Sequence, residues 1–151
     1  MPTKYRGSQD EVRALNALIN LTRASEGFAA SLQRELAGKR LTPSQFGILE
    51  ALLHLGPVCQ GELGDKLLRS GGSMTSVVEG LEKRGLVERR RDGTDKRFVT
   101  VRLTGEGKRL IGGIFPEHAR TVAQQFSALT APEQEELRRL CRKVGRAMER
   151  G

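Results

Sequence analysis

The chain has 151 residues, of which 37% are hydrophobic and 4% aromatic, with no Trp and one Tyr. This length suits one domain, or one domain with an oligomerisation arm, and the few aromatic side chains argue against a sheet that stacks nucleobases. No apolar run approaches the roughly 18 residues of a membrane span, and the start MPTKYRGSQDEV lacks the apolar core of a signal peptide. We therefore expect a cytoplasmic protein that does not enter the membrane.

Positive charge is concentrated in one short stretch of the chain. The net charge is +8, and residues 83–109 carry ten Lys or Arg against four Asp or Glu. Residues 1–82 are neutral overall, and residues 110–151 add only +2. A local positive field of this kind favours a polyanionic partner, for which nucleic acid is the usual candidate. The alternative is a basic surface that is simply solvated.

Two helices are expected before the middle of the chain. Residues 10–37 place apolar side chains three or four apart, which predicts an amphipathic helix about 40 Å long. Thr42 and Gln45 then form the pattern of a capping box, with a proline at the first helical position. The glycine and proline at 56–57 end this second helix.

The central segment predicts a helix-turn-helix followed by a β-hairpin. Short helices are expected at 60–69 and from about 73 to 84, the second ending at Gly85 in a left-handed conformation. Strands are expected at 86–91 and 98–103, joined by a polar turn. The sequence thus indicates a mainly α fold with a small β-hairpin wing, a winged helix-turn-helix.

Two further amphipathic helices are expected at the C-terminal end. Residues 107–128 carry helical apolar spacing, and Pro116 within them predicts a kink or a break. The last helix, 131–149, begins with a capping box of Thr130 and Glu133. One small protomer covers these apolar faces, and that of 10–37, only in part, which favours a homodimer over a compact monomeric bundle.

The start of the second helix of the pair carries candidate DNA-binding residues. Gly72 lets a phosphate approach the backbone N–H groups at the helix start, and Ser70 can cap it. Short hydroxyl side chains at Ser73, Thr75 and Ser76 can reach base edges or phosphates. The alternative is that these residues only cap and solubilise the helix.

The wing gives the stronger indication of DNA binding. Five cations occur between residues 89 and 97, and a slender basic loop fits the narrow minor groove. We predict that Arg97 enters that groove, that Asp95 orients it, and that Arg89 and Arg91 contact phosphates beside Lys96. The alternative is a charged edge hairpin that resists aggregation.

The cysteines and histidines give weaker signals. Cys59 is expected in the link before the helix pair, either buried and inert or, alternatively, as a redox or quinone sensor. Cys141 lies on the apolar stripe of the last helix and is expected to pack in an interface. His54 and His118 form no metal-ligand spacing with either cysteine, so no metal or other cofactor is expected.

Rival functional classes find little support in the sequence. An enzyme would need Cys59 or His118 as nucleophile or base, but no third partner, glycine-rich phosphate loop or carboxylate pair accompanies them. A winged domain that binds RNA or protein is a further alternative, and the polar, arginine-tipped wing favours duplex DNA over it.

Several motifs together resemble the MarR family of transcriptional regulators. They are the helix-turn-helix SMTSVVEGLEKRGLV, the wing RDGTDKR and the exit VRLTGEG. The flanking helices fit as well, so the resemblance spans nearly the whole chain. It implies a homodimeric DNA-binding repressor, occasionally an activator, that recognises a pseudo-palindromic operator and is released by a small aromatic, phenolic or quinone-type effector. The alternative is a thiol-based redox-sensing repressor that uses Cys59.

The resemblance also guides the domain boundaries. Residues 1–39 and 106–151 are expected to supply dimerisation helices around a DNA-binding domain at 40–105, all in one continuous structural unit. Asp95 and Arg97 match wing residues of the family, whereas Ser76 stands where the family often has Arg or Lys, so the operator cannot be carried over. The segments around 54–90 and 110–119 look most similar to the branch of repressors that control resistance to hydroquinones and catechols.

Overall fold

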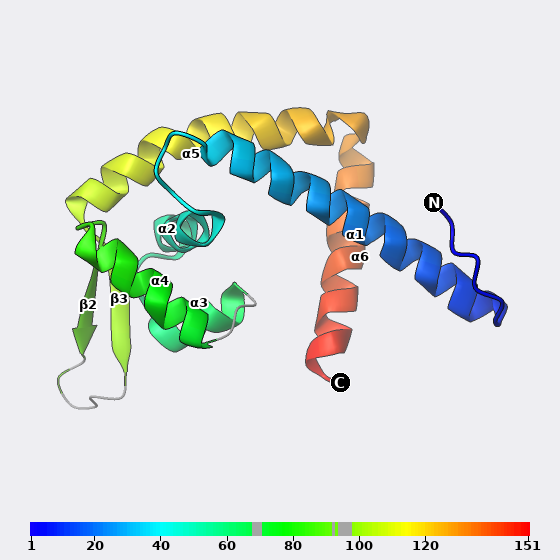
Figure 1. Cartoon of the computed structure of the whole chain (residues 1–151), viewed down its shortest axis with the longest axis horizontal. Helices are drawn as coiled ribbons and strands as arrows, with labels where there is room; N and C mark the ends of the chain where they lie inside the picture. Colours follow the sequence, from blue (N-terminus) through cyan, green and yellow to red (C-terminus); the bar gives the residue numbers. More distant parts are fainter. Residues whose placement is uncertain (68–70, 92, 94–97) are drawn as a thin grey trace. The chain divides into compact units, whose positions relative to one another are not determined.

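The computed structural model describes residues 1–67, 71–91, 93 and 98–151, and the side chains of 71–73 lie outside that description. Helices dominate, with a small antiparallel sheet in the middle of the chain (Figure 1). In chain order the elements are α1 Gln9–Leu36, α2 Pro43–Leu55, β1 Val58–Cys59, α3 Gln60–Lys66, α4 Gly71–Lys83, β2 Val87–Arg91, β3 Val99–Leu103, α5 Gly105–Gln125, the 3₁₀ helix η1 Phe126–Ala128 and α6 Ala131–Glu149. The expected mainly α fold with a winged helix-turn-helix is confirmed.

The helices begin where the sequence supplies caps. The Thr42 hydroxyl accepts the Gln45 N–H at 3.1 Å, and the Gln45 side chain accepts the Thr42 N–H at 3.0 Å. Thr130 and Glu133 repeat this reciprocal arrangement at the start of α6. Each box satisfies amide donors that a helix start otherwise leaves without a partner.

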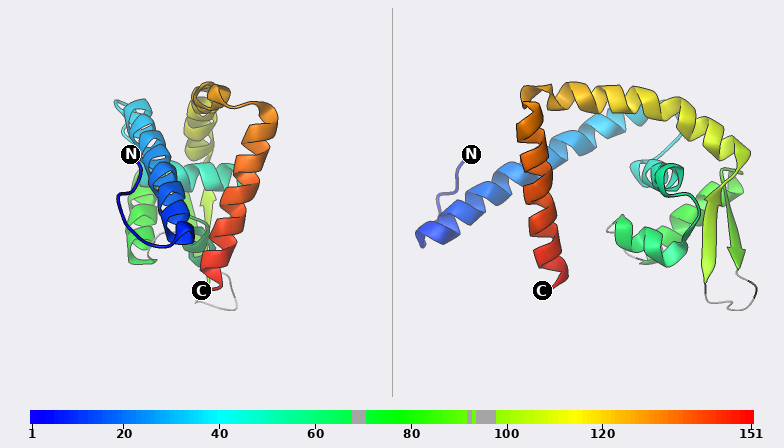
Figure 2. Two further views of the ribbon diagram at one scale, coloured as in Figure 1. Left: turned by 90° about the vertical axis from the view of Figure 1, so that its right-hand side faces the viewer. Right: turned by 180° about the vertical axis from the view of Figure 1, so that it is seen from behind.

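The chain divides into two compact units, Met1–Ile111 and Gly112–Gly151. In the first unit α2, α3 and α4 lie close together, and the β2–β3 pair stands against α4 (Figures 1 and 2). Side chains from each of these elements build one core. Its fully buried large members are Phe46, Ile48, Leu49, Leu63, Val78, Leu81, Val87, Val101 and Ile111. Burial of each such side chain stabilises the fold by about 1.5–3 kcal/mol, which makes this core the rigid support of the wing and of α4.

The sheet has a strand that the sequence patterns do not predict. Its order is β1-β3-β2, and all neighbours are antiparallel. The expected hairpin is β2–β3, in which Arg89 lies opposite Val101. Strand β1 has only two residues, too few to show an alternation, and Cys59 there pairs with Thr100 rather than lying in a link.

In the second unit, the rest of α5, η1 and α6 follow one another closely. The Gln134 side chain donates to the carbonyls of Phe126 and Leu129 at 3.0 and 3.2 Å, which ties α6 to η1. Of the kink or break expected at Pro116, the break does not occur, because α5 continues from Gly105 to Gln125 with Pro116 inside it. The residue four positions earlier is Gly112, whose missing side chain leaves the backbone free to adjust to the proline ring.

Candidate nucleic-acid interface

Helix α4 presents one apolar and one polar face. Met74, Val78 and Leu81 are at most 3% exposed and pack inward, whereas Ser76 and Glu79 are exposed. The buried positions are spaced four and three apart, so they form one stripe of the helix. The face that remains open therefore carries polar side chains.

The C-terminal end of α4 is fixed by a glycine turn. Gly85 has φ 72° and donates to the carbonyl of Glu82 at 2.9 Å, while Leu86 donates to Leu81 at 3.0 Å. This pair of hydrogen bonds is the Schellman motif, in which glycine avoids the strain of a positive φ. The left-handed Gly85 expected from the sequence is confirmed. The turn sends the chain directly back along α4 as strand β2.

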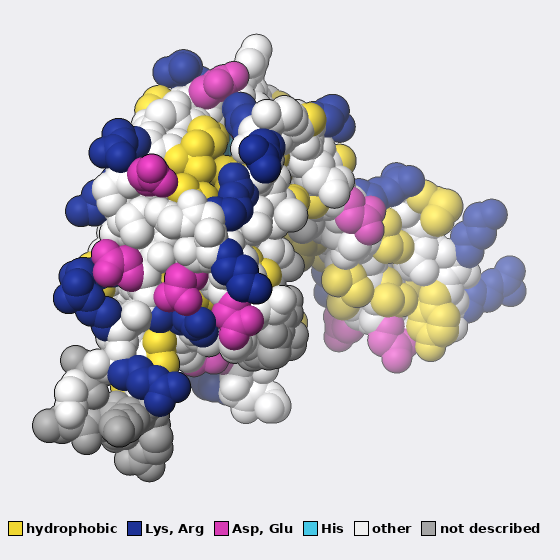
Figure 3. Space-filling view, turned by 60° about the vertical axis from the view of Figure 1, so that its left-hand side comes forward, with side chains coloured by type: hydrophobic (Ala, Val, Ile, Leu, Met, Phe, Trp, Pro, Cys, Tyr) yellow, Lys and Arg dark blue, Asp and Glu magenta, His cyan; other side chains and the backbone are white. Residues whose placement is uncertain are grey.

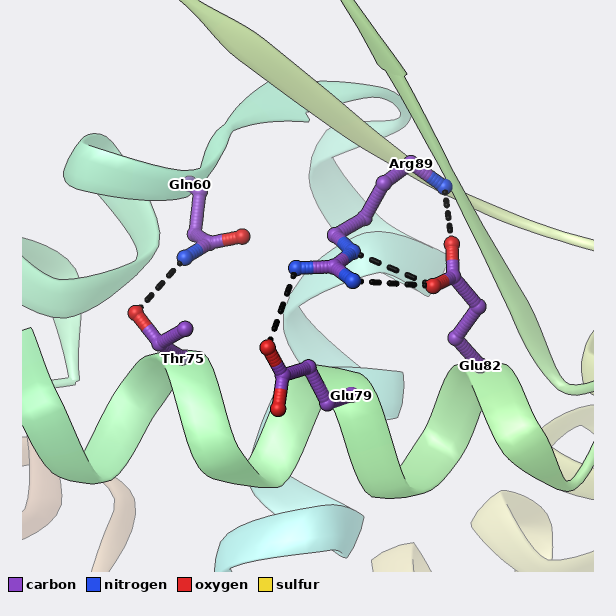
Figure 4. A network of polar contacts seen from close by, with 5 residues as sticks. All are labelled: Gln60, Thr75, Glu79, Glu82 and Arg89. Carbon is purple, nitrogen blue, oxygen red and sulfur yellow. Dashed lines mark hydrogen bonds and ion pairs between the residues drawn. The ribbon is translucent and has the colours of Figure 1, made fainter.

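An ion-pair cluster joins strand β2 to α4 (Figure 4). The carboxylate of Glu82 accepts three hydrogen bonds from Arg89: from the backbone N–H at 3.1 Å, from Nε at 3.2 Å and from Nη2 at 3.0 Å. Nη1 of Arg89 lies 3.7 Å from Glu79 Oε1. The hydrogen bond from the guanidinium lowers the pKa of Glu82 below its usual value and raises the pKa of Arg89.

A second polar contact joins α4 to α3. The Gln60 side chain, at the start of α3, donates from Nε2 to the Thr75 hydroxyl at 2.9 Å (Figure 4). Both side chains are half-buried. Thr75 therefore contributes to the contact between the two helices of the helix-turn-helix, in addition to its place near the helix start.

Much of the basic charge on the wing strands has acidic neighbours. Glu88 lies 3.6 Å from Arg90 on the same strand and 3.5 Å from Arg102 on the neighbouring strand β3. Figure 3 shows basic and acidic side chains interspersed over this face. Such exposed pairs contribute little to stability. Arg91, at the end of β2, is exposed.

The first turn of α5 is locked to the turn after α4. Thr104 donates its N–H to the Leu86 carbonyl at 3.1 Å and its hydroxyl to the Gly85 carbonyl at 2.6 Å. Gly107 packs so closely that a Cβ there would lie 2.0 Å from the Leu86 carbonyl oxygen. The motif LTGEG thus joins α5 rigidly to the end of α4.

The predicted DNA-binding residues fall into three groups. Ser70, Asp95, Lys96 and Arg97 lie outside the described residues, and for Gly72 and Ser73 only the backbone, which belongs to α4, is described. Thr75 and Ser76 lie on the first turns of α4, and Arg89 and Arg91 lie on β2, next to it. Contact of any of them with DNA stays a prediction. For Arg89, a phosphate would have to compete with two carboxylates.

Two acidic residues of this region were not identified from the sequence. Glu79 and Glu82 face β2 from α4, and their partner Arg89 is on the strand. The sequence feature that predicts this pairing is Gly85. A tight turn there brings Glu82, three residues earlier, near Arg89, four residues later. Charge counts alone cannot show this pairing, because it depends on the direction in which the strand leaves the turn.

The structure gives the surroundings of both cysteines and of His118. Cys59 is a half-buried free thiol, and Cys141 is a free, exposed thiol on α6. His118 packs its ring 5.9 Å from that of Phe115. Within residues 1–67, 71–91, 93 and 98–151, no three His, Cys, Asp or Glu side chains gather as ligands for a metal ion. No helix in the described part has the length and apolar character to cross a bilayer.

A groove of about 630 Å³ opens between the C-terminal end of α2, the base of the wing and the start of α5. Its floor and walls combine leucine and proline side chains with charged groups. They include Leu52, Leu53, Pro57, Leu103, Arg102 and Lys108. Apolar walls with a few polar groups are the usual composition of small-molecule sites.

The structure has a helix pair that packs on a common core, an open polar face on the second helix of the pair and an antiparallel wing beside that helix. These features define a winged helix-turn-helix protein that binds DNA. Comparison with known proteins agrees. The model of the MarR family matches residues 41–97. The regulator MhqR of Bacillus subtilis, described as an HTH-type transcriptional regulator, is 32% identical over 88% of this chain and 92% of its own. The chain belongs to the MarR family and is a DNA-binding transcriptional regulator rather than an enzyme.

Solved structures show the same fold. BpsR of Bordetella bronchiseptica superposes with a TM-score of 0.77 at 26% identity, over 85% of this chain and 98% of its own, and its DNA binding is regulated by 6-hydroxynicotinic acid. NadR, solved in complex with 4-hydroxyphenylacetate, superposes with a TM-score of 0.76 at 25% identity, over 95% of this chain and 97% of its own.

Proposed function

We propose that the protein is a homodimeric repressor that binds a pseudo-palindromic operator and leaves it when a small aromatic effector binds. The observation that carries the DNA-binding geometry is the open polar face of α4 next to strand β2. In this arrangement α4 enters the major groove and the wing reaches the neighbouring minor groove.

The contacts divide between the helix and the wing. The backbone at Gly72 receives a phosphate, and the hydroxyls of Ser70, Ser73, Thr75 and Ser76 contact phosphates or base edges. On the wing, Arg91 and Lys96 contact phosphates, and Arg97, oriented by Asp95, enters the minor groove.

Dimerisation is supported by apolar side chains that each unit leaves open. On α1, Leu18 and Leu21 are 57% and 45% exposed, and on α6, Val144 and Met148 are 52% and 72% exposed. A second copy would cover such faces, as oligomer interfaces do. A dimer of this kind places its two copies of α4 about 34 Å apart, which is one turn of DNA.

The effector is proposed to be a small aromatic molecule with a phenolic, carboxylate or quinone group. Support comes from the ligands of BpsR and NadR, both hydroxylated aromatic acids. The groove at the base of the wing offers Leu52 and Pro57 to a ring and Lys108 to an anionic group. Arg102 there lies 3.5 Å from the Glu88 carboxylate, which also lines the groove. Because the groove includes the first turn of α5, a bound ligand can shift the population between dimer geometries.

Selection of bound sequences from a pool of random duplexes tests the proposal. We expect an inverted repeat whose half-sites are centred about 10 base pairs apart, or a multiple of that. Binding should weaken steeply as the salt concentration rises. Retention of every duplex alike would instead indicate a basic surface without sequence recognition.

A further inference from the structure

The contact between Arg89 and Glu82 joins two elements that must meet DNA together. Arg89 lies on β2, the edge strand of the sheet, and Glu82 lies in the last turn of α4. The same carboxylate takes both the backbone N–H and the guanidinium of Arg89. A carboxylate bound in this way fixes the strand's position along the helix as well as the orientation of the side chain.

Unlike an arginine that is open to a phosphate, Arg89 already has two carboxylate partners for its guanidinium, Glu82 and Glu79. Its side chain is 28% exposed, and Glu79 approaches its remaining nitrogen. A phosphate contact would require the guanidinium to exchange carboxylate partners for another anion, with little net gain in charge–charge energy. Moving it would also leave the Glu82 carboxylate with only the backbone N–H of Arg89 as a donor among the described contacts.

We propose that Arg89 is a positioning residue: together with Glu82 and Glu79 it holds the wing at a fixed angle to α4, so that helix and wing reach adjacent grooves at once. It neutralises the acidic side of α4 internally and does not pair with DNA. This inference rests on the proposed DNA-binding mode. It also assigns a favourable role to Glu82, an anion that would otherwise repel the operator.

Conservative substitutions separate positioning from phosphate contact. Positioning predicts that Glu82→Gln weakens operator binding by about three- to tenfold, the effect of losing one half-exposed charge-assisted interaction. Arg89→Gln should weaken binding by a similar factor, and the double variant should be no weaker than either single one, because both remove the same contact. A phosphate contact predicts instead that Glu82→Gln strengthens binding and that the two effects add.

The same titrations also give the salt dependence of binding and the affinity of Arg89→Lys. The slope of log affinity against log salt should be unchanged in Arg89→Gln, whereas loss of a phosphate contact lowers it by about 0.9. Arg89→Lys should bind as weakly as Arg89→Gln, because an ammonium cannot reproduce the forked contact with Glu82, although it would serve a phosphate. Arg91→Gln, on the same strand, is the matched control and should lower the salt slope.

The outcomes separate the two proposals. Tighter binding by Glu82→Gln, or restored binding in Arg89→Lys, would overturn the positioning role while leaving operator binding intact. Absence of operator binding by the unaltered protein would overturn the proposed function itself. Circular dichroism identifies a variant that fails to fold. In that case Arg89→Lys, the mildest change, still decides through its affinity, which positioning predicts to be lowered and a phosphate contact predicts to be retained.

Discussion

Substitution of Gly107 tests how closely the first turn of α5 packs against the turn that follows α4. An alanine Cβ at this position would lie 2.0 Å from the Leu86 carbonyl oxygen and 3.3 Å from Leu103 Cδ2. Since real Cβ atoms do not approach a carbonyl this closely, the first turn of α5 must move. That movement opposes the hydrogen bond from the Thr104 N–H to Leu86, which measures 3.1 Å.

The Gly107→Ala substitution has two destabilising effects and one stabilising effect on the free energy of unfolding. Overpacking against backbone costs about 1–3 kcal/mol, and the weakened hydrogen bond about 1 kcal/mol. Replacement of glycine by alanine within a helix recovers about 1 kcal/mol. Gly107→Ala should therefore lower the free energy of unfolding by about 2 kcal/mol, or the melting temperature by roughly 4–8 °C for a chain of this size.

Chemical denaturation followed by circular dichroism, at one protomer concentration for all variants, measures this change. Gly105→Ala is the matched control, because its nearest neighbour is the flexible end of Arg109 at 3.5 Å. It should be neutral or slightly stabilising. Equal stability of Gly107→Ala and the unaltered protein would refute the close packing of α5 against the α4–β2 turn.

Three further predictions concern DNA binding, assembly and pH. Arg97→Ala should weaken operator binding by about 1–3 kcal/mol in a mobility-shift titration while the fold stays intact; unchanged affinity would refute its role in the minor groove. Val144→Glu, which places a charge on an open apolar face of α6, should lower the dimer mass in sedimentation, whereas Lys143→Glu should not, and a normal dimer in the first variant would exclude this face from the interface. Because Arg89 lowers the folded pKa of Glu82, the ionised carboxylate stabilises the fold above its unfolded pKa of about 4.5, and this contribution is lost as the pH falls through the lower folded pKa. The unfolding free energies of the unaltered protein and Glu82→Gln should differ at neutral pH and converge in acid, and a constant difference would contradict the assigned ion pair.

The sequence allows most of the fold to be predicted, because its signals are local. Capping boxes such as Thr42 with Gln45, the glycine turn at Gly85 and helical apolar spacing each depend on a few neighbouring residues. Strand β1 is missed, because two residues carry no periodicity. Of the kink or break predicted at Pro116, the break does not occur, because tolerance of a proline within a helix depends also on its surroundings.

Prediction of the site is less complete for a physical reason. The order of the elements along the chain predicts the helix and the wing of the interface, and the types of residue on them indicate contacts with DNA. The partner of each charge, however, is set by tertiary packing. Arg89 looks like any other arginine of the wing in the sequence, yet in the structure it is held by Glu82 and Glu79.

The proposed function requires two copies of this chain to bind one duplex through paired copies of α4. Sedimentation of the protein with its selected operator, compared with each alone, measures this stoichiometry. We expect a dimer that binds one duplex as a single complex of two chains. A single chain that sediments alone and does not bind the duplex at low ionic strength would exclude both the dimer and operator binding.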